Sequence, residues 1–547
     1  MRNLHFWFAA GMGALIITFA YAVLRIALQE SLWLDELHTS WTVSGAWHEI
    51  ASRAAAGNQT PLYFWVVGLV SQTPGQRPEW ILRLPSVVAW LLAIVLVVWQ
   101  VREKLARQRA QSWLFPLCIA SWIVLDRLQW FYATEARPYA LVQLISLAGW
   151  CCIQAIVLTE NRSHRTWTLI VVWCVLSLTN IYLHLTAALP VLFQWLVAIG
   201  LVLQRRRNRR LLESAVRVTA PNRKLSFLLV WLAAAIAVGF GLLPIMQLAF
   251  PVWLRRTQWA TFAGDVSLIN AAWMFPFIPV LLCVLIDCVV DRLLRGTANR
   301  SPITSEERCL WWSAMLGPWL TSWALAAAGV APMFHPRFVI ASAMPLFVVG
   351  AIELLRCRHW ASRWVTGLAI AIAIVYSQGS VSVWRGGYLV GNLRGEDWRA
   401  ATKWISQRFE PGEQLLCSSG LIEANSIAAK PLRLPLQADF AEYLSFPVLG
   451  IYRVADSSGQ FIPVTPLVGD HRQWAAQVSE HLAQKSAWTQ RLWLIYRGKP
   501  GRLKSKLTEF EADLRSKHLS FDATEPKQFG GLYVVELKPW KGTNRPP

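Results

Sequence analysis

The sequence predicts a polytopic α-helical membrane protein that carries a soluble α/β domain at its C-terminal end. Three observations predict this fold class. Hydrophobic residues make up 55% of the 547 residues, and the mean hydropathy is +0.36. Charged residues are only 16% of the chain, and they come in clumps. The clumps are separated by apolar runs close to the roughly 20 residues that a helix needs to cross a bilayer.

We expect eleven transmembrane helices within residues 1–383. The first apolar run is too long for a signal peptide and lacks a small-residue cleavage site, so we expect it to remain as a helix. The expected spans are Phe6–Leu28, Leu82–Val101, Trp113–Leu128, Tyr139–Leu158, Trp167–Ala187, Ala188–Leu203, Leu225–Leu248, Leu268–Val290, Cys309–Val330, Phe338–Leu355 and Trp364–Val383.

The basic residues predict the orientation. The net charge is +21, and most arginines and lysines gather in alternate loops, of which the richest are 102–109, 205–224 and 292–308. The positive-inside rule places these loops in the cytoplasm. With eleven crossings, the N-terminus is then cytoplasmic and the C-terminal domain lies outside. The same distribution argues against nucleic-acid binding, which needs a basic patch instead of charges that flank spans.

Two long outer segments are expected, a loop at 29–81 and a tail at 384–547. In the loop, Pro61–Val70 is apolar but too short to span, which predicts an interfacial helix. The tail alternates helical and strand-like patterns, which predicts a small α/β domain. Its expected helices are Glu396–Phe409, Arg472–Lys485 and Leu503–His518, and its expected strands are Gln414–Cys417, Leu492–Tyr496 and Gly531–Leu537.

The cysteines predict neither a disulfide framework nor a zinc site. There are nine, mostly in or beside apolar runs, and no CxxC pair occurs. Asp35, Glu36 and His38 would bind a divalent metal only with further ligands from elsewhere. We therefore predict no metal and no other cofactor.

Asp35 and Glu36 follow the first apolar run on the expected outer side. Two adjacent carboxylates at a membrane boundary are costly to desolvate unless they are paired or used. A carboxylate can take the proton of an acceptor hydroxyl, so Asp35 is a candidate base. Alternatively, Asp35 caps a helix that starts in a solvated loop.

Glu135 and Arg137 precede Pro138, which predicts the start of a helix. Free N–H groups and a guanidinium at such a start would bind a phosphate. The alternative is a local pair between the two side chains. Arg337 has a similar setting beside Pro336, although snorkelling to the interface would also explain it.

His184, His335 and Arg83 are further candidates near helix ends, although a lone histidine in a membrane helix is often a packing residue. All the candidates share one expected location, the outer ends of helices. They are Asp35, Glu36, Arg83, Glu135, Arg137, His184, His335 and Arg337. A shared outward-facing cavity with a base and phosphate-binding cations explains the set. A donor used there must already have crossed the membrane, as a polyprenyl-phosphate sugar has.

The motifs resemble those of the GT-C membrane glycosyltransferases, specifically bacterial relatives of the protein O-mannosyltransferases of glycosyltransferase family 39 and of the aminoarabinose transferase. The resemblance covers nearly the whole chain. It departs from the family after His184, where an aliphatic residue replaces an aromatic one, and at Phe338, which stands in place of Tyr. The segments that carry it are Asp35-Glu36, Asn58–Tyr63, Arg83–Ser86, Glu135–Tyr139, His184, Pro336–Phe338 and Glu396–Arg399.

The resemblance implies a GT-C fold and an inverting transfer of sugar from polyprenyl phosphate to an acceptor hydroxyl. It implies that Asp35 is the catalytic base and that Glu36 organises the site. The residues implied in binding the donor phosphate or the substrate are Arg83, Glu135, Arg137, Tyr139, His184, His335 and Arg337. The expected location is the periplasmic face of a bacterial inner membrane, with membrane lipid as a partner and no nucleic acid. The sugar, the acceptor (protein, lipid or glycan) and the role of the C-terminal domain stay open.

Rival functions predict different patterns. A lipid or glycan transporter or flippase would place its substrate residues near the bilayer midplane, often on broken helices in corresponding halves of the chain. Here the ionisable candidates lie at one face and the halves are not alike. A scaffold that only displays the C-terminal domain would not need eleven helices. A lipid-linked polymerase or ligase of the same architecture stays open.

Overall fold

The computed structural model describes residues 2–71, 78–107, 114–158, 164–216, 224–254, 266–293, 303–356, 360–377, 395–419, 438–455, 463–468, 471–483 and 490–539. The chain forms two compact units and enters each of them more than once. The first unit contains Met1–Arg25, Gln59–Val66 and Arg83–Leu389. The second unit contains Ile26–Asn58, Val67–Leu82 and Val390–Pro547. The expected outer loop 29–81 is therefore divided between the two units.

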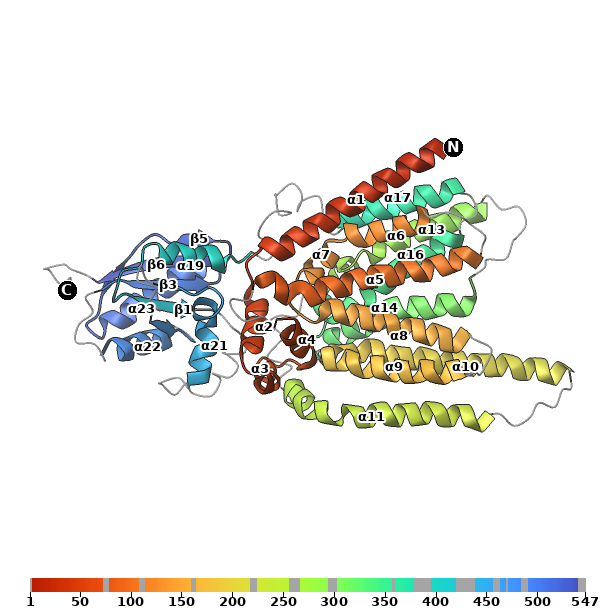
Figure 1. Ribbon diagram of the computed structural model, residues 1–547, viewed down its shortest axis with the longest axis horizontal. Helices are drawn as coiled ribbons and strands as arrows, with labels where there is room; N and C mark the ends of the chain where they lie inside the picture. Colours follow the sequence, from red (N-terminus) through yellow and green to blue (C-terminus); the bar gives the residue numbers. More distant parts are fainter. Residues whose placement is uncertain are drawn as a thin grey trace. The chain divides into compact units, whose positions relative to one another are not determined.

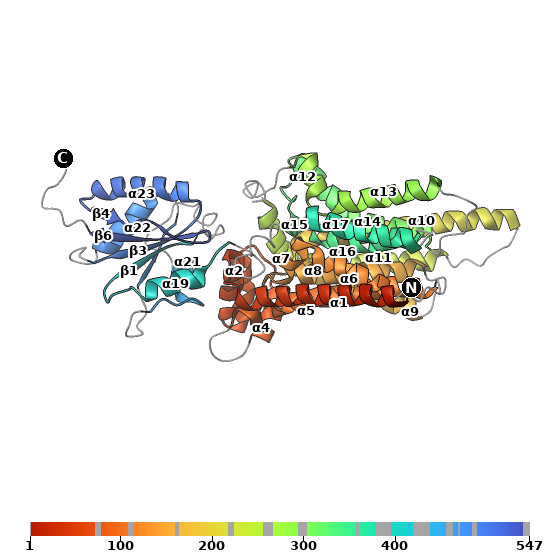
Figure 2. The ribbon, with the colours of Figure 1, turned by 90° about the horizontal axis from the view of Figure 1, so that it is seen from above.

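The first unit is helical and membrane-embedded, and its long helices run side by side (Figures 1 and 2). Its helices are α1 (Arg2–Gln29), α4 (Leu62–Val70), α5 (Glu79–Arg107), α6 (Leu114–Leu125), α7 (Arg127–Ala133), α8 (Tyr139–Leu158), α9 (His164–Leu183), η2 (Leu185–Ala187), α10 (Ala188–Val216), α11 (Lys224–Leu254), α12 (Leu268–Trp273), α13 (Phe277–Leu293), α14 (Ser305–Ala327), α15 (Pro336–Val339), η4 (Ile340–Ser342), α16 (Ala343–Arg356) and α17 (Trp360–Ser377).

Each expected span coincides with one of these helices or with helices separated by a short break. Among the described residues, six helices are long and apolar enough to cross a membrane, and a bent pair formed by α1 and α2 (Leu34–Ser44) raises this number to seven. The count of eleven spans stays a prediction. The expected span Leu268–Val290 is two helices, because Pro276 lacks the N–H that a continuous helix needs.

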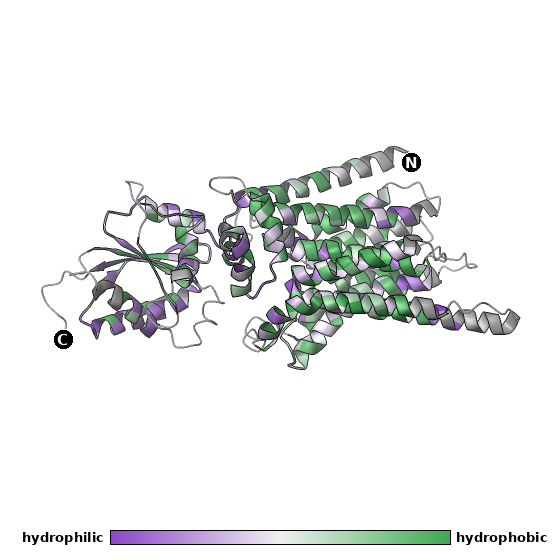
Figure 3. Cartoon of the chain, turned by 60° about the horizontal axis from the view of Figure 1, so that its bottom comes forward, coloured by the Kyte–Doolittle hydropathy of each residue, from purple (hydrophilic) through white to green (hydrophobic). Residues whose placement is uncertain are grey.

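Burial separates the central helices from the peripheral ones. In the run Pro336–Leu355, 94% of the most apolar window is buried, whereas in Leu229–Leu254 the share is 22%. The first run is therefore the centre of the bundle, and the second presents most of its apolar side chains to lipid. Figure 3 shows apolar residues along most of the length of these helices.

A polar layer joins α8, α14 and α16 at the end of the bundle where α8 finishes. Gln154 donates to Glu307 (3.0 Å) and accepts from the indole N–H of Trp311 (2.9 Å). One turn away, Glu353 accepts from Arg308 Nε at 2.8 Å. Each buried carboxylate thus has a partner, which avoids the cost of an uncompensated charge in a low-dielectric interior.

The second unit contains a mixed sheet of strand order β2-β1-β3-β6-β4, with β5 also paired to β6. β1 pairs in parallel with β2 and β3, and β6 is antiparallel to β3, β4 and β5. The strands are β1 (Gln414–Ser418), β2 (Val464–Pro466), β3 (Leu492–Arg497), β4 (Phe521–Ala523), β5 (Lys527–Phe529) and β6 (Leu532–Pro539), and the helices beside them are α19 (Trp398–Ser406), α21 (Ala438–Leu449), α22 (His471–Ala483) and α23 (Pro500–Arg515). The three expected helices and three expected strands of the tail are confirmed.

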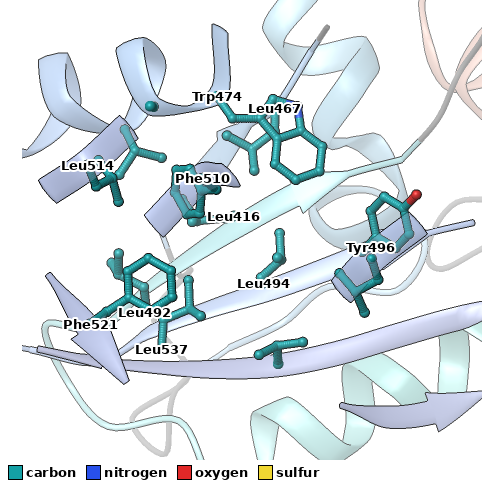
Figure 4. Close-up of a cluster of buried hydrophobic side chains, with 14 of the residues drawn as sticks. Leu416, Leu467, Trp474, Leu492, Leu494, Tyr496, Phe510, Leu514, Phe521 and Leu537 are labelled. Carbon is teal, nitrogen blue, oxygen red and sulfur yellow. The ribbon is translucent and has the colours of Figure 1, made fainter. Parts of the chain in front are cut away.

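One face of this sheet forms the core of the domain (Figure 4). Leu492, Leu494 and Tyr496 alternate along β3, so their side chains point to the same face. Trp474 of α22 and Phe510 of α23 cover that face and are almost fully buried. The domain therefore has an apolar core of its own, built from strand alternation and two amphipathic helices.

We predict that Phe510→Ala destabilises this domain by about 3–5 kcal/mol, because it removes a buried ring and leaves a cavity. Lys504→Ala on the same helix is the control, since Lys504 is exposed. Protease resistance of the C-terminal domain, measured on the full chain in detergent, should fall for the first variant alone. Equal resistance of both variants would contradict the packing described.

Candidate functional site

Three connections of the first unit come together around His184. The His184 ring lies 5.5 Å from the ring of Tyr139, at the start of α8, and 5.9 Å from that of Phe338, in α15. Its Nδ1 accepts from the backbone N–H of Thr186 (3.3 Å), so His184 caps η2. An accepting Nδ1 assigns the proton of a neutral imidazole to Nε2. Helix ends from three distant parts of the sequence thus share one polar cluster.

Two arginines belong to this cluster. Arg137 is buried, and the guanidinium carbon of Arg337 lies 4.8 Å from the ring centroid of Phe338. His184 lies in the connection between the spans Thr166–Leu183 and Leu185–Arg205. Burial first, and then the positive charges of Arg137 and Arg337, lower the pKa of His184 to about 3. At neutral pH the cluster therefore holds two cations and an uncharged imidazole, which suits an anionic ligand.

A second layer of contacts fixes the turn that carries Arg137. Ser86 Oγ donates to the Arg137 carbonyl at 3.0 Å and lies 3.2 Å from Tyr63 Oη. Arg83 precedes Ser86 by one turn of α5 and is fully buried. The Arg137 N–H donates to the Glu135 carbonyl at 2.8 Å, which closes a tight turn before α8. Arg83 and Glu135 are therefore on the segments that flank Arg137.

The segment before α4 supports the other side of the cluster. Thr60 Oγ1 donates to the carbonyl of Leu183, the residue before His184, at 2.8 Å. His335 has a comparable local role, because its Nδ1 accepts from the Arg337 N–H (3.3 Å) and caps α15. The His335 ring also lies 5.9 Å from that of Phe338. His335 thus fixes the helix turn from which Arg337 extends.

Asp35 and Glu36 belong to the second unit, in helix α2 (Leu34–Ser44). Glu36 is fully buried, and its Oε2 accepts from the Trp33 N–H at 3.3 Å. A carboxylate at the third position of a helix commonly satisfies such an N-terminal donor. Glu36 therefore caps the start of α2, a role for which the sequence suggests Asp35 as the alternative. Asp35 itself is partly exposed.

His38 is enclosed by its neighbours in the same unit. Its ring lies 6.0 Å from that of Trp41 and 5.7 Å from that of Tyr443. A β-carbon at Gly57 would lie 2.2 Å from the imidazole, so glycine is required there for steric reasons. Among the described residues, no group of three or more His, Cys, Asp or Glu side chains could hold a metal ion.

The structure thus brings together seven of the nine predicted site residues within the first unit and places Asp35 and Glu36 in the second. The supporting roles of Tyr63, Ser86 and Thr60 were not predicted. Their only signal in the sequence was that they lie in the strings Asn58–Tyr63 and Arg83–Ser86, which the family resemblance had marked. Hydroxyl groups in apolar segments carry no chemical signature that reveals their partners.

No protein-family model and no curated protein sequence matches the chain. The chain is similar to the crystal structure of ArnT from Cupriavidus metallidurans bound to undecaprenyl phosphate, with 13% sequence identity and a TM-score of 0.48 over 96% of this chain and 98% of that one. It is also similar to the archaeal oligosaccharyltransferase AglB from Archaeoglobus fulgidus in complex with an inhibitory peptide and a dolichol-phosphate, with 11% identity and a TM-score of 0.42 over 94% and 73% of the two chains. Both are GT-C glycosyltransferases, the class that the motifs resemble. Because each TM-score is below 0.5, the function proposed below depends on this chain's own residues.

We predict that His184 makes the protein less stable in acid. Its pKa of about 3 in the folded protein lies below the ordinary histidine value of 6.5. A group of this kind contributes stability above pH 6.5 that is lost as the pH falls towards 3, since only the unfolded chain binds the proton. Thermal unfolding in detergent at pH 7.5 and pH 5 should therefore show a smaller acid loss for His184→Gln than for the wild type.

The control for this prediction is His48→Gln, because His48 is exposed. Its acid loss should equal that of the wild type. If His184→Gln also keeps the full acid loss, the imidazole is not held neutral beside Arg137 and Arg337.

Proposed function

We propose that this chain is a glycosyltransferase of the GT-C class that moves a sugar from a polyprenyl-phosphate donor to an acceptor hydroxyl. The observation that carries the proposal is the cluster of Arg137 and Arg337 around a neutral His184. Two arginines beside a buried, uncharged imidazole make the cluster positively charged, and a positive cluster favours an anionic ligand. A donor phosphate has the charge, and its lipid tail suits helices that face the bilayer.

The location of the cluster supports a reaction at the outer, periplasmic face. Arg137 precedes the first residue of α8, whereas Arg205 donates to the Val157 carbonyl in the last turn of that helix. A helix of 20 residues spans about 30 Å, the thickness of the hydrocarbon core. Arg205 begins the basic segment 205–224, which starts within α10 and which the positive-inside rule assigns to the cytoplasm. The cluster then lies at the opposite face, where nucleotide sugars are absent and lipid-linked sugars are the available donors.

The proposed chemistry needs a base and charge compensation. The acceptor oxygen attacks the anomeric carbon from the side opposite the phosphate and gives its proton to Asp35. The bond between the anomeric carbon and the phosphate oxygen breaks, and its electron pair leaves with polyprenyl phosphate. Arg137 and Arg337 stabilise the charge that develops on this leaving group. Attack from the opposite side inverts the anomeric configuration.

Within this mechanism, His184 donates a hydrogen bond from Nε2 and does not supply a proton, because its low pKa keeps it uncharged. Tyr139 lies against its ring and limits its orientation. Arg83, Glu135 and His335 are proposed for the same binding region, because the first two flank the turn that carries Arg137 and His335 caps the helix that carries Arg337. Asp35 is proposed as the base on sequence grounds, and Glu36 as the residue that orders its helix.

We predict that Asp35→Asn lowers kcat by about 10²–10⁴-fold, the usual contribution of a general base. The measurement is release of free polyprenyl phosphate when the purified protein is incubated with a panel of polyprenyl-phosphate sugars. Glu49→Gln, in the same unit, is the control and should keep wild-type activity. A folded Asp35→Asn variant with wild-type turnover would exclude Asp35 as the base.

We predict that Arg137→Gln and Arg337→Gln each weaken donor binding or turnover by about tenfold to a hundredfold, since a hydrogen bond to a charged group contributes about 1.5–3 kcal/mol. Arg127→Gln is the matched control, because Arg127 is exposed at the start of α7. The measurement is kcat/KM for the donor. Unchanged values for both variants would contradict a phosphate site at this cluster.

A transporter or flippase is the second candidate, and the product distinguishes it. An enzyme releases polyprenyl phosphate and a glycosylated acceptor, whereas a flippase moves the intact donor across vesicles. Transport without release in the same preparation would favour the flippase.

A further inference from the structure

One buried carboxylate of the second unit holds the start of α2. Glu396 is 6% exposed, and its Oε2 accepts from the backbone N–H of Leu34 at 3.1 Å and from the indole N–H of Trp398 at 3.0 Å. Its Oε1 accepts from Arg497 Nε at 2.6 Å. Leu34 is the first residue of α2 and the neighbour of Asp35. The N–H groups of a first helical turn have no partner within the helix, and a carboxylate there is favourable.

Further contacts hold the segment that leads into α2. Tyr452 Oη accepts from the Leu32 N–H at 2.6 Å and from Ser31 Oγ at 3.1 Å. Arg399 donates to the carbonyls of Gln29 (3.0 Å) and Glu30 (3.4 Å). Side chains of the C-terminal sheet domain therefore bind the backbone of Gln29, Glu30, Leu32 and Leu34 and the hydroxyl of Ser31.

The body of α2 packs on the same domain. Leu34 and Trp41 form an apolar cluster with Tyr443 of α21 and with Val468, which follows β2. Helix α2 lies beside α21 in two views of the second unit (Figures 1 and 2). At the far end, Arg53 of α3 (Ile50–Ala56) donates to the Trp41 carbonyl of α2 at 3.1 Å and lies 3.6 Å from Glu442. Side chains at both ends and along one face thus fix this helix.

These contacts are made by the carboxyl edge of the sheet. Arg497 is the last residue of β3, and Val468 follows the end of β2. In sheets with parallel strands in the order β2-β1-β3, this edge contains the switch point where ligands usually bind. Here the chain's own helix α2 and the segment before it are held at this edge.

We infer that the C-terminal sheet domain positions Asp35 for catalysis and that Glu396 is the positioning residue through which it does so. The inference rests on the proposed function of Asp35 as the base. Glu396 touches neither substrate nor reacting atoms, and it acts by fixing the first turn of α2. A base displaced by about 1 Å can lose a hundredfold in rate while substrate binding stays intact.

The test is Glu396→Gln, with Glu413→Gln as a matched control. Glu413 is also buried, and it also accepts from an arginine, Arg491, and from an indole N–H, that of Trp493 at 2.7 Å. Both of these partners lie within the C-terminal sheet domain. The two substitutions therefore cost the domain similar contacts, but only Glu396→Gln changes the acceptor of the Leu34 N–H.

We expect Glu396→Gln to lower kcat by about tenfold to a hundredfold relative to Glu413→Gln, with the donor KM within about twofold. Backbone amides 31–37 should exchange hydrogen faster in Glu396→Gln alone. In an Asp35→Asn background, adding Glu396→Gln should lower kcat no further, because the residue acts through Asp35. Equal kcat for Glu396→Gln and Glu413→Gln overturns the inference.

A second variant covers a loss of folding in Glu396→Gln. Tyr452→Phe removes the hydroxyl that holds Ser31 and Leu32, and it should also lower kcat at unchanged donor KM; wild-type kcat in this variant overturns the inference. Full activity of Asp35→Asn would show that Asp35 is not the base. If backbone amides 31–37 still exchange hydrogen faster in Glu396→Gln, the result then supports only the contact by which Glu396 holds the start of α2. If Asp35→Asn is inactive and neither positioning variant changes kcat, the base stands and the positioning role is wrong.

Discussion

Every buried charge in this protein needs a partner from the chain or from a ligand, because the hydrocarbon core offers neither water nor counter-ions. The first unit meets this constraint in two ways at the two ends of α8. At the end of the helix, hydrogen bonds between neighbouring helices hold Gln154, Glu307 and Glu353. At its start, Arg137 and Arg337 lie around an uncharged His184. The first arrangement fixes the bundle, and the second gathers positive charge around one buried imidazole.

The neutrality of His184 decides what chemistry the cluster can support. A third cation there would raise the cost of assembling the site, and a readily protonated imidazole would act as a general acid. Neither is needed when the leaving group is a phosphate, because compensation of its charge is enough for it to depart. Burial and the charges of Arg137 and Arg337 keep the imidazole in this state, and the contact with Thr186 orients the ring. The proposed donor class therefore follows from the charge pattern of the cluster.

The second unit changes how the acidic motif is understood. Asp35 does not lie on an isolated loop, because α2 is part of the compact unit that contains the C-terminal sheet. Its first turn is held by Glu396, and its apolar face packs with Tyr443 and Val468. A C-terminal domain with no role in holding α2 would not need a buried ion pair at the start of that helix. The contacts show that the C-terminal domain holds the start and one face of α2.

Much of the fold could be read from local pattern. Most helices of the first unit and the strands β1, β3 and β6 were predicted close to their observed bounds, since hydrophobic run length and alternation depend on neighbouring residues alone. Helix α10 was predicted to end at Leu203 but continues to Val216. Helix α21 and the short strands β2, β4 and β5 were missed. The three short strands have three residues each, too few for an alternation to be recognised. Helix α21 contains Pro447, which weakened its helical pattern.

The sequence by itself determined which residue types stand at the ends of the membrane helices, and hence the candidates Arg137, His184 and Arg337, because charge and proline at the edge of an apolar run are local features. Only the tertiary structure decided their partners. Leu34 and Glu396 are 362 positions apart, and Thr60 and Leu183 are 123 apart. Such hydrogen bonds form between groups that every chain has in abundance, so their pairing depends on how the helices and the sheet pack and not on any string of residues.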